Sequence, residues 1–234
     1  AFLGTMFVGG EFSYIKKYAY DSMSEKTENR KNYVENTLAN KTPLVFEAGK
    51  EVNSITKKIL KASGTDLSAL STNKDISREI LNDSTDTLIT LLRRGLVNDA
   101  YIILDTGSLY SEGSSDVLAT TYIRDVNVTS VSESVNKNIF LETGSSDLSQ
   151  DFDIMLDSEW TAHMQLSGGE DGDFGFYYKT IKTARENPQI DMENLGYWSG
   201  FSSISKTGRK SMRYTLPLVA DDGTVYGVIG IGLM

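Results

Sequence analysis

The residue types that carry out most enzyme chemistry are scarce in this chain. Its 234 residues contain one histidine, His163, and no cysteine. A serine triad would need His163 as its base, yet the sequence has no G-x-S-x-G segment to carry the nucleophile. His163 also lies in a stretch where apolar and polar residues alternate, which favours a position on the face of a strand. We therefore expect no enzymatic activity and assign no catalytic residue.

Residues that line small-molecule pockets are abundant. Tyrosine and tryptophan offer apolar walls with a hydrogen-bonding tip, which suits a pocket for a small polar ligand, although an ordinary aromatic core is the alternative. Arg124 could donate paired hydrogen bonds to an anionic or carbonyl group of the ligand, or belong to an ion pair. The predicted ligand-binding residues are Tyr122, Arg124, Trp160, Phe176, Tyr178, Tyr197, Trp198 and Tyr214.

Two acidic stretches have some of the oxygen ligands that calcium prefers. Residues 168–173 combine three glycines with three carboxylates, and Asp151, Asp153 and Asp157 follow one another closely. Neither has the spacing of an EF-hand loop, so a solvated loop and the caps of a short helix are the favoured interpretations. We expect no metal and no cofactor.

Composition narrows the choice of partners. The formal charge is −9 and the pI is about 4.7, which argues against nucleic acid or an anionic membrane surface as the main partner. The absence of cysteine excludes disulfides and thiolate metal sites. The sequence contains no run of about 18 apolar residues, which is the length that a helix needs to span a bilayer. The apolar residues 1–10 are either the end of a membrane anchor or a buried segment or tag remnant.

Periodic patterns predict helices in the first part of the chain. Apolar residues recur every three or four positions from 11 to about 62, with a polar, solvent-exposed stretch at 21–32 and a break near Pro43. A second helix is predicted from about Asp75, as its N-cap, to Arg94. A short helix is expected near 151–157.

Strands are predicted in the remainder. Residues 100–104 form a short apolar run typical of a central strand, and 120–125, 159–166 and 197–199 are further strand candidates. A helix is expected to run to Glu186, where Asn187-Pro188 ends it. Strands interrupted by helices favour an α+β fold over a repeating βαβ pattern.

The chain closes with a strong hairpin signal. Residues 214–219 and 225–231 are two extended segments, and the turn between them, Ala220-Asp221-Asp222-Gly223-Thr224, contains the Asp-Gly pair typical of tight turns. Pro217 cannot donate a hydrogen bond within a sheet, so we expect it at an edge or a bulge.

This hairpin resembles the closing hairpin of bacterial Cache sensor domains, which are PAS-like modules outside the membrane. Segments upstream are similar to the aromatic pocket segments of that family: Asp173-Phe174-Gly175-Phe176-Tyr177-Tyr178-Lys179, Ala184 and Gly196-Tyr197-Trp198-Ser199. The resemblance covers roughly residues 98–234. It implies a long N-terminal helix followed by a PAS-like antiparallel sheet flanked by helices, and it is closest to the membrane-distal type of module.

The chain departs from the amino-acid-binding members of that family. Those have an arginine two places before a Trp-Tyr pair, where this chain has Gly175 before Tyr177-Tyr178. They also carry an aspartate shortly after a later tyrosine, and none follows Tyr197 at that place. The family's hairpin often ends Gly-Ile-Asp, and here it ends Gly230-Ile231-Gly232. An amino acid is therefore not the expected ligand.

These features predict a helical stalk at 1–65 and a sensor domain at 66–234. The resemblance implies an extracytoplasmic, ligand-sensing domain of a bacterial membrane-anchored signalling protein. A diguanylate cyclase or a histidine kinase of a two-component system is favoured over a chemoreceptor. The membrane would be reached only through segments outside this chain, and a homodimer could form through the N-terminal helix. The alternatives are a structural interaction domain without a ligand and, less favoured, a soluble hydrolase.

Overall fold

The computed structural model describes residues 2–110, 116–128, 136–203 and 209–234, and in the first helix the side chains of residues 17, 18, 20–32 and 35–39. The chain forms two compact units, Ala1–Lys41 and Thr42–Met234. Helix α2, which the sequence placed with the stalk at 1–65, belongs to the second unit. The reason is its apolar stripe, which includes Val45, Val52 and Ile59 and is buried.

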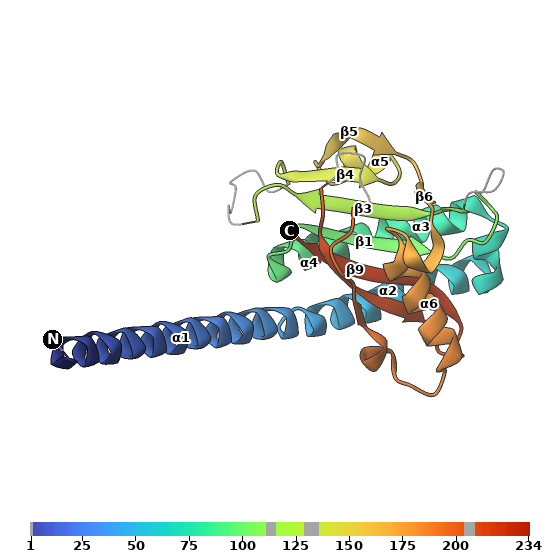
Figure 1. Cartoon of the computed structure of the whole chain (residues 1–234). Coiled ribbons are helices and arrows are strands. Elements are labelled where there is room, and N and C mark those ends of the chain that lie inside the picture. Colours follow the sequence, from blue (N-terminus) through green and yellow to red (C-terminus); the bar gives the residue numbers. More distant parts are fainter. Residues whose placement is uncertain (1, 111–115, 129–135, 204–208) are drawn as a thin grey trace. The chain divides into compact units, whose positions relative to one another are not determined.

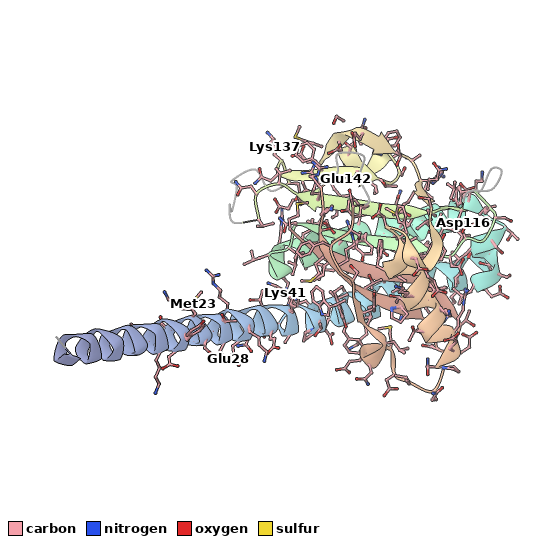
Figure 2. All side chains as sticks on the ribbon, viewed as in Figure 1. Met23, Glu28, Lys41, Asp116, Lys137 and Glu142 are labelled. Carbon is pink, nitrogen blue, oxygen red and sulfur yellow. The ribbon has the colours of Figure 1, made fainter. Side chains whose placement is uncertain are left out.

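The first unit is a single long helix, α1 (Phe2–Ala39). Its described side chains are mostly exposed; Tyr18, Tyr20 and Met23 are each about two thirds exposed. Figure 2 shows Met23 and Glu28 projecting from the helix. Among the described residues, no helix is both long enough and apolar enough to cross a membrane.

The second unit begins with consecutive helices and continues with strands that further helices interrupt (Figure 1). Its helices are α2 (Thr42–Ser63), η1 (Leu67–Ser71), α3 (Lys74–Asp83), α4 (Thr85–Gly95), α5 (Asp147–Asp151), η2 (Gly169–Asp171), α6 (Gly175–Glu186) and η3 (Met192–Leu195). Its strands are β1 (Asp99–Leu104), β2 (Asp116–Leu118), β3 (Thr120–Asp125), β4 (Ile139–Thr143), β5 (Met155–Thr161), β6 (Met164–Leu166), β7 (Tyr197–Trp198), β8 (Met212–Val219) and β9 (Val225–Leu233).

Seven strands form one sheet in the order β5-β4-β3-β1-β9-β8-β7, and β2 pairs with β6 in a separate ribbon. All neighbours are antiparallel except β4 and β5, which are parallel. The central pair joins β1 to β9, strands from distant parts of the chain (Figure 1). The α+β fold predicted from the sequence, a long N-terminal helix followed by a PAS-like antiparallel sheet with flanking helices, is confirmed.

The closing hairpin also forms as predicted. Strands β8 and β9 pair along their length, and the turn between them is closed by the amide of Ala220, which donates to the carbonyl of Thr224 at 3.0 Å. Gly223 has φ of +85°, a value that side chains with a Cβ rarely adopt. Pro217 comes after the two residues of β8 that pair with β7. Pairing with β7 therefore requires no amide donor from Pro217.

The sheet separates two apolar cores. One face packs against α2, α3 and α4, with Ala100, Ile102 and Leu104 of β1 buried beneath them. The other face packs against α6, and the alternate residues Tyr101 and Ile103 are buried there. Because successive side chains of a strand point to opposite faces, alternate residues of the buried strand β1 belong to different cores.

Two predicted helices were wrong in their limits. The helix expected at 75–94 is two helices, α3 and α4, which meet at Ser84, and the N-cap is Asn73, whose side chain accepts from the amide of Asp75 at 2.9 Å. The helix expected at 151–157 ends at Asp151, since Asp153 takes a left-handed conformation with φ of +50° and the chain continues into β5.

Candidate ligand-binding groove

A groove of about 460 Å³ runs along α6 on the face of the sheet that this helix covers. Helix α6 forms one wall, and the opposite wall consists of the turn after β1, the ribbon strand β2 and η2. Of the eight predicted ligand-binding residues, the groove has Tyr178 alone in its lining. Its lining includes Asp105, Asp116, Leu118, Glu170, Tyr177, Tyr178, Ile181, Lys182, Arg185 and Glu186.

Two tyrosines of α6 form an aromatic corner in this groove. The rings of Tyr177 and Tyr178 lie 5.3 Å apart between centroids and are nearly perpendicular, at 79°. Neighbouring residues of a helix point about 100° apart, so Tyr177 is buried against the sheet while Tyr178 stands at the rim. The hydroxyl of Tyr178 donates to a carboxylate oxygen of Asp116 at 2.9 Å, which ties α6 to β2.

The groove carries more negative than positive charge. Four carboxylates and two basic side chains line it, which gives a formal charge of −2. Lys182 pairs with Glu170 at 2.8 Å, and Arg185 pairs with Asp105. Asp116 is exposed, accepts only a neutral hydroxyl, and has no ion pair among the residues described.

Both tyrosines are held in their neutral form. Burial, with a smaller contribution from Asp105, raises the pKa of Tyr177, and burial and the carboxylate of Asp116 raise the pKa of Tyr178 to about 12. Neutral phenol rings present electron-rich faces that attract cations, most strongly where two rings form a corner beside a carboxylate. This arrangement suits the binding of an organic cation.

A polar cluster is buried on the same face of the sheet. Tyr101 stacks on Tyr122 with ring centroids 5.9 Å apart, and its hydroxyl hydrogen-bonds to the hydroxyl of Thr215 at 2.7 Å. The guanidinium of Arg213 lies 5.3 Å from the ring centre of Phe176 and donates to the carbonyl and hydroxyl of Ser202 at 2.9 and 2.8 Å. The cluster ties β1, β3, β8 and α6 together.

Asp99 is the acidic member of this cluster and is fully buried. Its carboxylate oxygens make no hydrogen bond of ordinary geometry with any described residue. Burial raises the pKa of Asp99 to about 6, against the opposing charge of Arg213. Gly232 lies directly opposite on β9, and any side chain there would overlap the Asp99 carboxylate.

The structure divides seven of the eight predicted ligand-binding residues between the two faces of the sheet. Tyr122 and Phe176 are buried in the core beneath α6, where Tyr197 packs against them, and Tyr178 lines the groove. On the other face, Trp160, Trp198 and Tyr214 pack in the core beneath α2, α3 and α4. The eight residues do not share one cavity, and their roles in binding stay predictions.

Arg124 already has partners. It pairs with Glu142 and, at 2.7 Å, with Asp157, and its guanidinium lies 5.3 Å from the ring centre of Phe140. Arg209 completes this network through Glu142 at 2.9 Å. Figure 2 shows Glu142 well separated from Asp116, so the network and the groove lie in different parts of the second unit.

Sequence reasoning missed several of the polar residues that the fold brings together. Asp116 was not named because nothing in its own segment marks it; only the pairing of β2 with β6 sets it beside α6. Asp99 and Arg213 could have been found, since each is a charged residue at the start of an apolar strand whose alternate positions face the same core. Among the described residues, no three histidine or carboxylate side chains gather closely enough to hold a metal ion.

No protein-family model matches the chain, and no curated protein matches it. Among solved structures, the chain is similar to the sensory domain of the Campylobacter jejuni chemoreceptor Tlp3 (CcmL), with 15% sequence identity and a TM-score of 0.35 over 85% of this chain. The match covers 61% of the length of that sensory domain.

Proposed function

We propose that this chain is an extracytoplasmic sensor domain of a bacterial membrane-anchored signalling protein, and that it binds a small organic cation in the groove along α6. The observation that carries the proposal is the corner of Tyr177 and Tyr178 beside the exposed carboxylate of Asp116. The antiparallel sheet and the resemblance of its hairpin to Cache domains support the sensory role.

The groove has the parts that recognition of an alkylammonium group requires. The two rings supply cation–π attraction, Asp116 supplies a charge, and Leu118 and Ile181 supply an apolar floor for the alkyl part of the ligand. Binding transmits a signal when the ligand has different affinities for two arrangements of the protein. The output module would be a diguanylate cyclase or a histidine kinase, with a chemoreceptor as the third choice, and no catalysis is expected in this chain.

Titration with choline by calorimetry, with the neutral isostere 3,3-dimethylbutan-1-ol as control ligand, tests the proposal. We expect choline to bind and the neutral alcohol not to bind. Asp116→Asn should weaken choline binding by about tenfold, because a charged contact is lost. Asp83→Asn removes the same charge from an exposed position of α3 and should leave the affinity unchanged.

A second pair of variants separates the contribution of the Tyr178 ring to binding from that of its hydroxyl. Tyr178→Leu removes an aromatic wall and should weaken choline binding, whereas Tyr178→Phe keeps the ring and frees Asp116 from its hydrogen bond, so binding should persist. The proposed cation site is wrong if choline, tetramethylammonium and 1,5-diaminopentane all fail to bind, or if Asp116→Asn binds them as the wild type does.

A further inference from the structure

A second hollow, of about 280 Å³, lies on the opposite face of the sheet from the groove along α6. It is bounded by α3, the start of β3, the turn after β4, and the segment from Trp160 to His163. It contains the only histidine of the chain and one of its two tryptophans. The proposed function makes no use of these side chains.

Aromatic rings form the walls of this hollow. The rings of Tyr110 and His163 lie 4.2 Å apart between centroids, at an angle of 45°. The indole of Trp160 is fixed by its N–H, which donates to the carbonyl of Gly144 at 3.1 Å. The walls are therefore positioned before any ligand arrives, and a planar ring could pack against them at little entropic cost.

The charge of the hollow is opposite to that of the whole chain. Lys74 and Arg78 line it with a single carboxylate, Asp75, so its formal charge is +1 in a protein whose total is −9. Asp75 pairs with Arg78 at 2.9 Å. The ammonium of Lys74 lies 5.0 Å from the ring centre of Tyr110 and has no carboxylate partner among the described residues. One cation beside the aromatic walls is thus available to an anion.

His163 adds a group that responds to an anion. Partial burial, and then the positive charge of Lys74, lower the pKa of this imidazole. The charged groups that face it are Lys74, Asp75 and Arg78 of α3, with the phenol of Tyr110 beside it. An anion bound between Lys74 and His163 would offset the repulsion between them, and binding would then be accompanied by protonation of the imidazole.

We propose that this hollow is a second ligand site, specific for a small aromatic carboxylate. The aromatic ring of the ligand packs against the Tyr110–His163 ring pair and Trp160, and its carboxylate faces Lys74. The site is independent of the proposed cation groove, because the two lie on opposite faces of the sheet and share no lining residue.

Fluorescence of Trp160 provides the measurement. In a Trp198→Phe background all tryptophan emission comes from Trp160. We expect benzoate to change this emission saturably, and neutral benzamide to have little effect. Lys74→Gln should weaken benzoate binding by about tenfold. Lys58→Gln, which removes the same charge from an exposed position of α2, should not.

The pH dependence distinguishes the role of His163. Benzoate affinity should rise by about threefold or more between about pH 7.5 and about pH 5.5, and His163→Gln should abolish that rise. The proposal is overturned if benzoate gives no saturable change, if benzamide binds equally well, or if Lys74→Gln has no effect. Asp116→Asn should leave benzoate binding intact and Lys74→Gln should leave choline binding intact, so failure at one site is separable from failure at the other.

Discussion

Single residues of the core beneath α6 have unusual electrostatics. Asp99 and Arg213 are both almost wholly buried, and burial of charge is costly unless it is paired and hydrogen-bonded. Arg213 has partners in Ser202 and the ring of Phe176, whereas the carboxylate of Asp99 has no hydrogen bond of ordinary geometry among the described residues. The charge of Asp99 is therefore less well compensated by its surroundings than that of Arg213.

The pKa of Asp99 predicts a pH dependence of stability. Its pKa rises from 3.8 to about 6 on folding, so the proton stabilises the fold below about pH 4, and this contribution is lost as the pH rises through 6. Relative to Asp99→Asn, the free energy of unfolding of the wild type should fall by on the order of 2 kcal/mol between about pH 4 and pH 7.5. Urea unfolding at several pH values measures it. A difference between the two proteins that does not change with pH would contradict the prediction.

The sequence showed which segments are rich in aromatic residues, but it did not show which of these residues contact one another in the fold. Aromatic residues of the second half of the chain are divided between the two cores, whereas the sequence predicted that they line one pocket. Their division between two faces followed from the strand register, since Tyr101 pairs with Tyr122 in one core while Trp198 contacts Tyr214 in the other. Register depends on pairing partners far away in the chain, which a local pattern does not specify.

At the scale of elements, α2 is held to the closing hairpin by a polar contact inside an apolar interface. The hydroxyl of Tyr226 on β9 donates to the side-chain carbonyl of Asn53 at 2.6 Å, and the amide of Asn53 donates to the carbonyl of Val219 at 3.0 Å. One asparagine therefore bridges both strands of the hairpin. This contact orients α2 on the sheet.

Removal of the Tyr226 hydroxyl tests that contact. Tyr226→Phe keeps the buried ring but leaves the carbonyl oxygen of Asn53 without this donor, so the free energy of unfolding should decrease by about 1–3 kcal/mol. Chemical denaturation measures the change. As a control, Tyr178→Phe removes a hydroxyl at the rim of the groove and should cost less, and an equal loss for both variants would argue against a special role for the α2 contact.

Sequence signals that act within a few residues predicted helices and strands correctly. Features that depend on distant parts of the chain were missed. The β8–β9 hairpin and the end of α6 before Pro188 were predicted because turn and proline chemistry act within a few residues. The parallel pairing of β4 with β5 and the break between α3 and α4 at Ser84 were not, because both depend on what the segments pack against.

At the scale of the whole molecule, the chain consists of two separate units. The described side chains of α1 are largely exposed, whereas α2 is packed into the second unit. Exposed Tyr18, Tyr20 and Met23 offer apolar contacts for a second copy of the helix, but the polar stretch at 21–32 is unfavourable for a strong coiled coil. We expect the intact protein to dimerise through α1 and this chain alone to do so weakly.

A truncated protein of residues 42–234 tests this arrangement. It should unfold cooperatively at the same midpoint as the full chain, because residues 42–234 form a compact unit with a buried core of their own, and it should remain monomeric in sedimentation velocity. The full chain should show at most weak, concentration-dependent association. A tight dimer of residues 42–234 would exclude α1 as the main interface.

The pairing of β1 with β9 also has a consequence for the order in which the chain folds. The two strands are central neighbours, yet about 125 residues separate them along the chain. As the chain folds from its amino-terminal end, β1 can pair with β3, but its other edge stays open until β9 is available to pair with it. During that interval the apolar run from Ala100 to Leu104 is an unpaired edge, which is the kind of segment that chaperones bind and that promotes aggregation.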